Sequence, residues 1–290
     1  VKMADEAVCI GPAKAQQSYL NINNILSAAV QKEVEAIHPG YGFLAENSEF
    51  AQMCEEIGAK FIGPTGDAIA RLGQKSLAKK LMASQGVPVI PGPEEGFTDA
   101  NKALKEARKV GFPIVLKAVS GGGGRGIRFV EDEKIFIPTF EEASHEADIS
   151  FNDPHIYLEK FLKNPKHIEI QIVADHHGNC VHFGERDCSS QRRKQKIIEE
   201  TPSPVIDDEK RKWIGNKVTK ALKNLGYTNA GTVEFLYENG KFFFMEMNTR
   251  IQVEHPITEI TTSTDLIKEQ IRVAADEPLS KKQSEIKWNY

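Results

Sequence analysis

Residues 231–256 read GTVEFLYENGKFFFMEMNTRIQVEHP, and this stretch decides how the second half of the chain is interpreted. It contains two β-like runs, 231–237 and 241–247, joined at Glu238-Asn239-Gly240. From the end of the second run onward, a polar group falls on every second residue. In an extended chain such side chains share one face of the strand. The residues of this row are Glu246, Asn248, Arg250, Gln252 and Glu254.

Two carboxylates, two amides and a guanidinium on one face can ligate a metal, bind an oxyanion and accept a proton. The row therefore indicates a lined site. The alternative is an exposed strand that carries ion pairs, since such rows are common on solvated sheet faces. The stretch by itself does not separate the two interpretations.

The turn between the two runs decides whether Glu234 and Glu246 meet. A two-residue Asn-Gly turn would put them on opposite faces, whereas a three-residue loop with a left-handed Gly240 would pair them. A shared metal requires the longer loop, and two hard oxygen ligands on adjacent strands suit Mg²⁺. The alternative, two exposed glutamates, is weakened by the apolar character of this hairpin. Its aromatic residues are Phe235, Phe242, Phe243 and Phe244.

The second half of the chain as a whole is typical of an α+β lobe with one antiparallel sheet. A long helix is expected near 207–225. The predicted strands are 156–160, 167–174, 181–186, 196–201, 231–237 and 241–247.

The first part of the chain alternates short β-like runs with helical patterns, which predicts a parallel α/β layer. We expect strands at 8–10, 35–38 and 60–62, and helices around 21–31 and 48–57. His38-Pro39-Gly40-Tyr41-Gly42 follows the second strand, either as a ligand-binding edge or as a plain Gly/Pro turn. The proline-rich segment 86–93 indicates a boundary, because its prolines forbid a continued helix.

A glycine-rich loop, 120–126, lies between the apolar runs 114–118 and 127–130. Glycines let backbone N–H groups approach phosphate oxygens, and Lys117 and Arg125 add charge. The loop lacks the Gly-Lys-Ser/Thr sequence and the following helix of a Walker-type phosphate loop. We interpret it as a flexible phosphate-binding hairpin, with a plain flexible linker as the alternative.

Composition bounds the class of protein. The chain has 290 residues, 40% of them hydrophobic, and a formal net charge of −4, which argues against a nucleic-acid binder. Its four cysteines show neither disulfide nor zinc spacing, which suggests a reducing compartment. The sequence shows no apolar run of membrane-spanning length and no signal-peptide pattern. We expect no membrane partner and a cytoplasmic location, with an organelle matrix as the alternative.

Several motifs in order give the chain a family resemblance that covers it from end to end. It resembles the biotin carboxylase component of biotin-dependent carboxylases, in the ATP-grasp superfamily. The motifs that carry the resemblance are 36–44 (AIHPGYGFL), Lys117 with its glycine loop, 158–160 (LEK), 167–169 (HIE), 184–189 (GERDCS), 191–193 (QRR) and 246–256 (EMNTRIQVEHP).

The resemblance implies a fold and a domain organisation. A partial N-terminal α/β domain, parallel and Rossmann-like, is expected over 1–73, and an ATP-grasp domain over 74–290. The glycine-loop lid is expected at about 89–161, and the C-terminal end of the ATP-grasp domain looks incomplete. The expected fold class of the chain is therefore α/β in its first domain and α+β in its second.

The resemblance also implies an activity and partners. It implies ATP-dependent carboxylation of biotin by bicarbonate through carboxyphosphate, with Mg²⁺ or Mn²⁺. Biotin would be presented by a biotin carboxyl carrier protein or domain and passed on to a carboxyltransferase, as in the acyl-CoA carboxylase of fatty acid biosynthesis. The full-length protein is expected to be a homodimer.

Site residues follow from the positions that match the family's motifs. The expected ATP ligands are Lys75, Lys117, Gly123, Gly124, Glu159, Lys160, Leu162, His167, Gln191 and Leu236. The expected metal ligands are Glu234 and Glu246, assisted by Asn248. The bicarbonate and biotin pocket is expected from Lys196, Arg250, Gln252, Val253 and Glu254. Glu254 would be the base for bicarbonate, Arg250 would stabilise the biotin enolate, and Lys196 would also serve catalysis.

The chain departs from the family pattern at one position and at both ends. Lys194 stands where relatives often have histidine. The family's first strand would precede residue 1, and a further arginine of the biotin site would follow residue 290. We therefore expect a fragment that carries most of the ATP site, and we make no prediction of whether it turns over without the missing ends. Two other readings remain: another ATP-grasp ligase, such as one that forms carbamoyl phosphate, and a truncated non-catalytic nucleotide-binding or assembly module.

Overall fold

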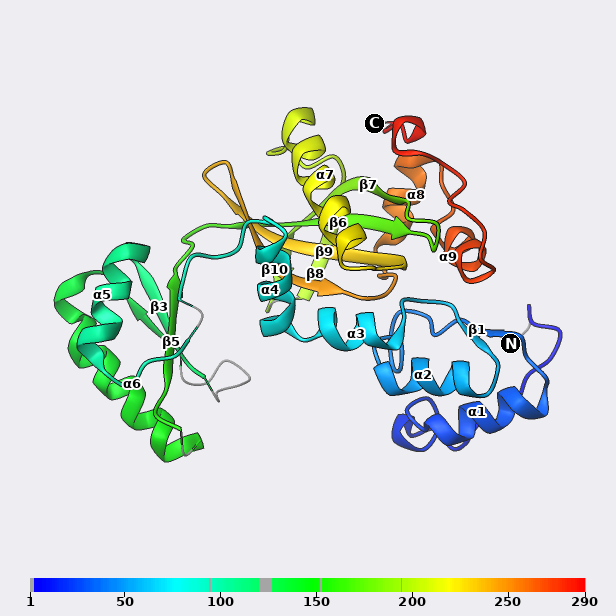
Figure 1. Cartoon of the computed structure of the whole chain (residues 1–290), viewed down its shortest axis with the longest axis horizontal. Helices are drawn as coiled ribbons and strands as arrows, with labels where there is room; N and C mark the ends of the chain where they lie inside the picture. Colours follow the sequence, from blue (N-terminus) through cyan, green and yellow to red (C-terminus); the bar gives the residue numbers. More distant parts are fainter. Residues whose placement is uncertain (1–2, 94, 120–126, 152, 194, 290) are drawn as a thin grey trace. The chain divides into compact units, whose positions relative to one another are not determined.

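The computed structural model describes residues 3–93, 95–119, 127–151, 153–193 and 195–289 (Figure 1). The chain forms two compact units. The first unit combines Val1–Pro88 with Lys166–Tyr290, and the second consists of Val89–Pro165.

The first unit opens with short helices and two short strands. The elements in order are η1 (Ala15–Gln17), α1 (Ile22–Gln31), β1 (Ala36–Ile37), α2 (Ser48–Glu56), β2 (Lys60–Phe61), α3 (Gly66–Gly73) and α4 (Lys75–Ser84). β1 and β2 are parallel, as the alternating pattern predicts. Asn21 and Asn47 cap α1 and α2 by accepting backbone N–H groups, which fixes where these helices begin.

The strand expected at 8–10 does not form. Among the described residues the small parallel sheet contains only β1 and β2, so the backbone of 8–10 has no strand to pair with. The carbonyl oxygen of Ile10 instead accepts a hydrogen bond from the Asn24 side chain, at 2.8 Å. A β-like run needs a partner as well as propensity, and this expectation was wrong for that reason.

The rest of the first unit is built on a five-stranded antiparallel sheet with the order β10-β9-β6-β7-β8. Its strands are β6 (Lys166–Ala174), β7 (Cys180–Arg192), β8 (Gln195–Glu200), β9 (Asn229–Glu238) and β10 (Lys241–Asn248). Helix α7 (Asp208–Asn224) packs on β6 and β7, and the chain closes with α8 (His255–Thr262), α9 (Leu266–Ala274) and η3 (Gln283–Glu285).

The β9–β10 hairpin corrects the expectation for its turn. Glu238 pairs with Lys241, so the loop has two residues, and Asn239 and Gly240 both have positive φ. That turn alone would separate Glu234 from Glu246. The register then shifts after Phe244, and Glu246 pairs with Glu234. One extra residue, Met245, forms a β-bulge that restores the pairing.

The second unit has its own sheet, with the order β4-β3-β5. Its elements are α5 (Ala100–Val110), β3 (Ile114–Ala118), β4 (Ile127–Val130), η2 (Glu133–Ile135), α6 (Phe136–Phe151) and β5 (Ile156–Lys160). β3 is the central strand, with β4 paired on one side and β5 on the other. The prediction that 156–160 belongs to the large sheet was therefore wrong. The glycine loop 120–126 lies outside the described residues.

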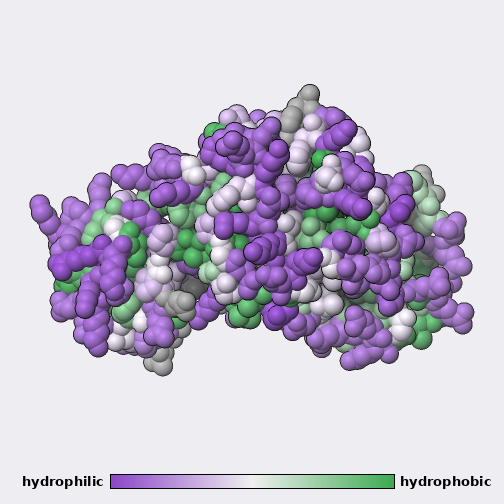
Figure 2. Space-filling view, turned by 45° about the horizontal axis from the view of Figure 1, so that its top comes forward, coloured by the Kyte–Doolittle hydropathy of each residue, from purple (hydrophilic) through white to green (hydrophobic). Residues whose placement is uncertain are grey.

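The two faces of the large sheet differ in character. Ile168, Ile170 and Ile172 of β6 are fully buried on the face that α7 covers, where Gly215 of that helix lies against the ring of His182. The opposite face carries the polar residues of the same strands. In the view of Figure 2, hydrophilic residues cover most of the surface. Among the described residues, no helix is both long enough and apolar enough to cross a bilayer.

Candidate active site

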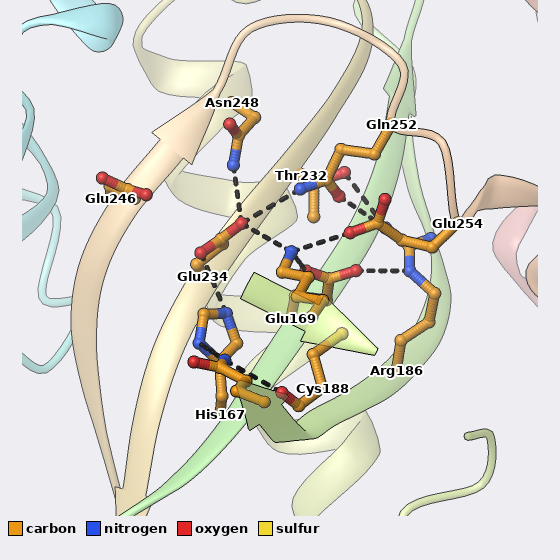
Figure 3. A network of polar contacts seen from close by, with 12 residues as sticks. His167, Glu169, Arg186, Cys188, Thr232, Glu234, Glu246, Asn248, Gln252 and Glu254 are labelled. Atoms are coloured by element: carbon orange, nitrogen blue, oxygen red, sulfur yellow. Dashed lines mark hydrogen bonds and ion pairs between the residues drawn. The ribbon is translucent and has the colours of Figure 1, made fainter. Parts of the chain in front are cut away.

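One face of the large sheet carries polar side chains from four neighbouring strands (Figure 3). Residues directly opposite each other in an antiparallel pair share a face. Glu169 of β6 pairs with Glu234 of β9, which in turn pairs with Glu246 of β10. His167 pairs with Leu236, and Gln171 pairs with Thr232. We call this the polar face of the sheet.

A second β-bulge brings Arg186 to the polar face. Ile172 pairs with His182, but Ile170 pairs with Glu185, so β7 has one residue more than β6 at Phe183-Gly184. Gly184 has a φ of 86°, a conformation that favours glycine. After this bulge Arg186 stands opposite Glu169. Without the bulge, Glu185 would occupy that position and Arg186 would point to the α7 side.

Lys196 lies among three carboxylates of the polar face. Its Nζ atom is 2.9 Å from Glu234 Oε1 and 2.8 Å from Glu254 Oε1, and it also forms an ion pair with Glu169. Burial lowers the pKa of this lysine, but the charges of Glu169 and Glu234 and its hydrogen bonds outweigh burial and raise it above the ordinary value. Lys196 is therefore a fixed cation at neutral pH.

Glu234 has polar neighbours at both carboxylate oxygens. Oε1 accepts from Lys196, from Asn248 Nδ2 at 2.8 Å and from Gln252 Nε2 at 3.0 Å. Oε2 lies 2.9 Å from His167 Nε2. Burial raises the pKa of Glu234, but the hydrogen bond from His167 and the charge of Lys196 outweigh it, and the pKa falls to about 2. Glu234 is ionised throughout the neutral range.

The expected metal ligands fit Mg²⁺ by chemistry and by placement. Glu234 and Glu246 offer hard oxygen atoms from opposite positions of adjacent strands, on one face. Glu246 forms an ion pair with the largely exposed Lys75. Asn248 turns its nitrogen to Glu234 and its oxygen to Arg250, at 3.1 Å.

Two clusters of potential ligand atoms lie close together on the polar face. His167, Glu169 and Glu234 form one cluster, and Glu169, Cys188 and Glu254 form the other. Burial and the nearby Glu169 charge raise the pKa of the Cys188 thiol, which makes the second cluster a poor metal site. The first cluster shares Glu234 with the expected magnesium ligands.

The predicted bicarbonate residues extend from this network. Arg250 donates from Nε to Glu46 Oε2 at 2.9 Å and from Nη2 to Asn248. Gln252 is buried and contacts Glu234, whereas Val253 is largely exposed. Burial raises the pKa of Glu254, but its hydrogen bond with Lys196 lowers it overall, so this carboxylate is ionised at neutral pH.

The expected nucleotide residues divide between the units. On the first unit, the His167 Nδ1 atom accepts a hydrogen bond from Gln191 Nε2 at 3.1 Å, and Leu236 is half-buried next to His167. Because Nδ1 accepts, the proton of this imidazole sits on Nε2, facing Glu234. Lys75 also belongs to the first unit.

The second unit holds the remaining expected nucleotide residues. Lys117 of β3 forms an ion pair with Glu159 of β5. Lys160 directs its Nζ to the carbonyl oxygens of Gly111 and Phe112, at 2.9 and 2.8 Å, so its side chain serves the local fold. Leu162 is buried. The expected lid residues Gly123 and Gly124 lie outside the described residues, as does Lys194.

Three residues of the network have no role predicted from the sequence. Glu169 could have been found, because it follows His167 by two residues on a predicted strand. Arg186 needed the bulge, and the only signal was an isolated glycine, Gly184, within a strand pattern. Glu46 is far from Arg250 in sequence, and no local signal connects them.

Comparisons with known proteins agree with this architecture. Residues 1–69 match the sequence model of the biotin carboxylase N-terminal domain, and residues 74–282 match that of the carbamoyl-phosphate synthase L chain ATP-binding domain. Biotin carboxylase 1 of Bacillus subtilis (strain 168) is 50% identical over 290 residues, which cover 99% of this chain and 64% of the relative. The chloroplastic biotin carboxylase 1 of Populus trichocarpa is 51% identical over 287 residues, covering 99% and 54%.

A solved structure gives the same result. It is the biotin carboxylase domain dimer of Hydrogenobacter thermophilus 2-oxoglutarate carboxylase, in complex with MgADP, ADP and bicarbonate. The TM-score is 0.82 at 47% identity, and the match covers 99% of this chain and 64% of that one. The chain thus spans 54 to 64% of the length of these relatives.

The fold and the polar face define an ATP-grasp protein, in which an α/β segment precedes an ATP-binding domain. The match of residues 1–69 and the similar proteins identify the group within that class. The chain belongs to the biotin carboxylase family.

Proposed function

We propose that the protein uses ATP and bicarbonate to carboxylate biotin, the first half-reaction of a biotin-dependent carboxylase. One observation carries the proposal. Lys196, a permanent cation, is held by Glu169, Glu234 and Glu254 beside the Gln252 amide, in a chain that belongs to the biotin carboxylase family. A fixed cation and an amide next to an ionised carboxylate suit a small anion that must lose a proton.

The proposed chemistry uses the polar face in two steps. Bicarbonate gives its proton to Glu254, its oxygen attacks the γ-phosphorus of ATP, and ADP leaves as carboxyphosphate forms. Carboxyphosphate then breaks its bond between the carboxyl carbon and the phosphate oxygen, and the released phosphate accepts the proton of a ureido N–H of biotin. The deprotonated nitrogen bonds to the carboxyl carbon, and Arg250 stabilises the biotin enolate that this proton transfer forms. General-base help of this kind is typically worth about 10² to 10⁴ in rate. Lys196, Arg250, Gln252 and Val253 would hold the bicarbonate.

The nucleotide and metal residues are proposals of the same kind. Glu234 and Glu246, with Asn248, would hold Mg²⁺ or Mn²⁺, which offsets the charge on the transferring phosphoryl group. Lys75 and Lys117 would contact ATP phosphates, with Gly123 and Gly124 over them. The adenine and ribose side would be formed by Glu159, Lys160, Leu162, His167, Gln191 and Leu236. The carbonyl contacts of Lys160 support a backbone rather than an ammonium contact at that position.

Partners and location follow from the same proposal. The biotin would be carried by a carrier protein or domain and delivered to a carboxyltransferase. The full-length protein would be a homodimer, since the similar Hydrogenobacter domain is a dimer in its solved structure. We propose a cytoplasmic location, with an organelle matrix as the alternative because the Populus relative is named chloroplastic. The domain boundaries near residues 73 and 89–161 remain predictions.

ADP release by this chain tests the proposal. Mg-ATP is supplied with bicarbonate, with free biotin, with both, or with neither. We expect release that requires bicarbonate and rises with biotin. A chain that binds ATP but releases no ADP under any condition would contradict the proposed activity for these 290 residues and favour a non-catalytic nucleotide-binding module.

A second candidate is an ATP-grasp ligase that forms carbamoyl phosphate. It is favoured by one observation, the match of residues 74–282 to the ATP-binding domain of carbamoyl-phosphate synthase. The same assay separates the two, because bicarbonate-dependent ADP release that ignores biotin and rises with ammonia would support the second candidate.

A further inference from the structure

Arg186 is fully buried and donates all of its N–H groups to side chains on and next to the polar face. Nε donates to Glu169 Oε1. Nη1 donates to Gln171 Oε1 at 2.8 Å and to Thr258 Oγ1 at 2.9 Å. Nη2 donates to Gln252 Oε1 at 2.7 Å and to Thr232 Oγ1 at 3.4 Å. Five donors thus meet five acceptors.

We propose that Arg186 is a positioning residue that sets the bicarbonate pocket by fixing Gln252 and, through Glu169, Lys196. This inference rests on the proposed function. Arg186 itself is covered by the groups it contacts, so it acts through them and does not touch the substrate.

The first effect of Arg186 is to orient an amide. A guanidinium only donates, so it fixes the oxygen of the Gln252 amide toward itself. The amide nitrogen must then face the other way, where it donates to Glu234 at 3.0 Å. In the flipped orientation the amide would place N–H groups against Arg186 and an oxygen against the Glu234 carboxylate, losing both hydrogen bonds. Arg186 and Glu234 therefore together fix the orientation of the Gln252 amide.

The second effect concerns charge. Arg186 occupies one oxygen of Glu169 and Lys196 occupies the other. The network contains three negative charges and two positive ones. The carboxylates are Glu169, Glu234 and Glu254, and the cations are Arg186 and Lys196. Without the arginine, Lys196 alone would face three carboxylates. The pocket would then repel a bicarbonate anion, and the lysine would be drawn toward Glu169.

A lysine cannot take over this role. Its ammonium is a single point with three donors, whereas the contacts of Arg186 diverge from three nitrogen atoms. Arg186→Lys keeps a positive charge next to Glu169 but cannot also reach Gln252 and Thr258. The substitution therefore separates positioning from charge.

The same sheet offers a matched control on its other face. Arg211 of α7 is also buried and donates twice to Glu185, at 2.5 and 2.7 Å. Glu185 neighbours Arg186 in sequence but points toward α7, away from the polar face. Arg211→Lys disturbs a buried Arg–Glu pair of the same kind without touching Gln252 or Glu169.

The experiment compares the unsubstituted chain with Arg186→Lys, Thr258→Val and Arg211→Lys. The Kd for [¹³C]bicarbonate is measured by line broadening in the presence of Mg-ADP, the KM for bicarbonate by ADP release, and the Kd for ATP by calorimetry. Because bicarbonate and Mg-ADP bind without turnover, the Kd remains measurable even in a chain that releases no ADP. Melting temperatures report on folding.

We expect Arg186→Lys to raise the Kd and KM for bicarbonate by about tenfold to a hundredfold, the effect of losing hydrogen bonds to a charged donor. Thr258→Val should raise them by a smaller factor, about two- to tenfold, and it carries the test if the lysine variant does not fold. ATP affinity should be unchanged in both. Arg211→Lys should lower the melting temperature and leave the bicarbonate constants as they are.

Two results would overturn the inference while leaving the proposed function intact. One is unchanged bicarbonate binding in folded Arg186→Lys or, where that variant does not fold, in Thr258→Val. The other is an equal weakening in Arg211→Lys, which would show a general loss of rigidity. Absence of bicarbonate binding in the unsubstituted chain would instead refute the bicarbonate pocket, and the inference would fail with it.

Discussion

Glu234 keeps its negative charge because donors surround both of its carboxylate oxygens. Its side chain is only 5% exposed, so burial works against the charge, yet His167 and Lys196 lower its pKa from 4.5 to about 2. A carboxylate with a lowered folded-state pKa stabilises the fold above its unfolded pKa. That contribution is complete above about pH 4.5 and is lost as the pH falls toward 2.

This sign leads to a prediction for Glu234→Gln. Because the pKa difference corresponds to about 3 kcal/mol, the variant should be less stable than the unsubstituted chain by about that amount at pH 7. The gap should stay constant from pH 7 to pH 5 and shrink below pH 4.5, as measured by urea unfolding at each pH. Glu56→Gln, at an exposed position of α2, should show no gap. A gap that widens in acid would contradict the assignment.

Arg250 is held by groups that match the planar shape of its guanidinium. Nε meets Glu46, Nη2 meets Asn248 and Nη1 meets the carbonyl oxygen of Ile251, at 2.9 to 3.1 Å. A lysine cannot reproduce these divergent hydrogen bonds.

We therefore predict that Arg250→Lys loses most biotin-dependent ADP release, by roughly ten- to a hundredfold, while retaining ATP binding. Calorimetry with ATP and the release assay with biotin measure the two properties. Arg272→Lys, at a half-exposed position of α9, is the control and should behave like the unsubstituted chain. Full biotin-dependent activity in Arg250→Lys would refute the role given to this residue.

At the scale of elements, two β-bulges bring Arg186 and Glu246 to the polar face. The bulge at Phe183-Gly184 turns Arg186 toward Glu169, and the bulge at Met245 pairs Glu246 with Glu234. Trp288 covers the first bulge, and its Nε1 donates a hydrogen bond to the carbonyl oxygen of Phe183 at 2.9 Å. A Cβ atom at Gly184 would lie 2.5 Å from that Nε1 atom.

Gly184→Ala should therefore destabilise the fold by more than the positive φ alone requires. Gly178 offers the matched comparison, since its φ of 83° is close to the 86° of Gly184 but its Cβ would approach nothing nearer than 4.0 Å. We expect Gly178→Ala to cost about 1 kcal/mol and Gly184→Ala about 2 to 4 kcal/mol in urea unfolding. An equal loss of unfolding free energy in the two variants would mean that the Trp288 ring moves aside without an energetic penalty.

The same two bulges mark where sequence reasoning reached its limit. Alternation and composition predicted all five strands of the large sheet, such as 167–174 for β6 (Lys166–Ala174), because hydrophobic period is a local property. Register is not local. The two-residue Asn239-Gly240 turn alone would put Glu246 on the face opposite Glu234. The extra residue Met245 shifts the register by one, so both features are needed to pair Glu246 with Glu234. The polar row was visible in the sequence, but its partners Glu46, Glu169 and Arg186 were not assigned.

At the scale of the whole molecule, the sheet membership of β5 depends on tertiary pairing. Its sequence resembles that of the strands that follow it, yet it pairs with β3 in the second unit. That unit has a core cluster drawn only from its own residues. The fully buried core residues include Ile114, Leu116, Phe136, Ile156 and Leu158.

A self-contained core predicts that residues 89–165 fold without the rest of the chain. The fragment should unfold cooperatively in urea, monitored by circular dichroism, with a stability of no more than about 3 to 5 kcal/mol because a single core of this size supplies little more. Residues 1–88 are the control and should not fold alone. Arg71 of this segment donates to the carbonyl oxygen of Leu225, and Glu46 binds Arg250, so its contacts are completed by the second half of the first unit. A non-cooperative 89–165 fragment would show that its core needs the larger unit.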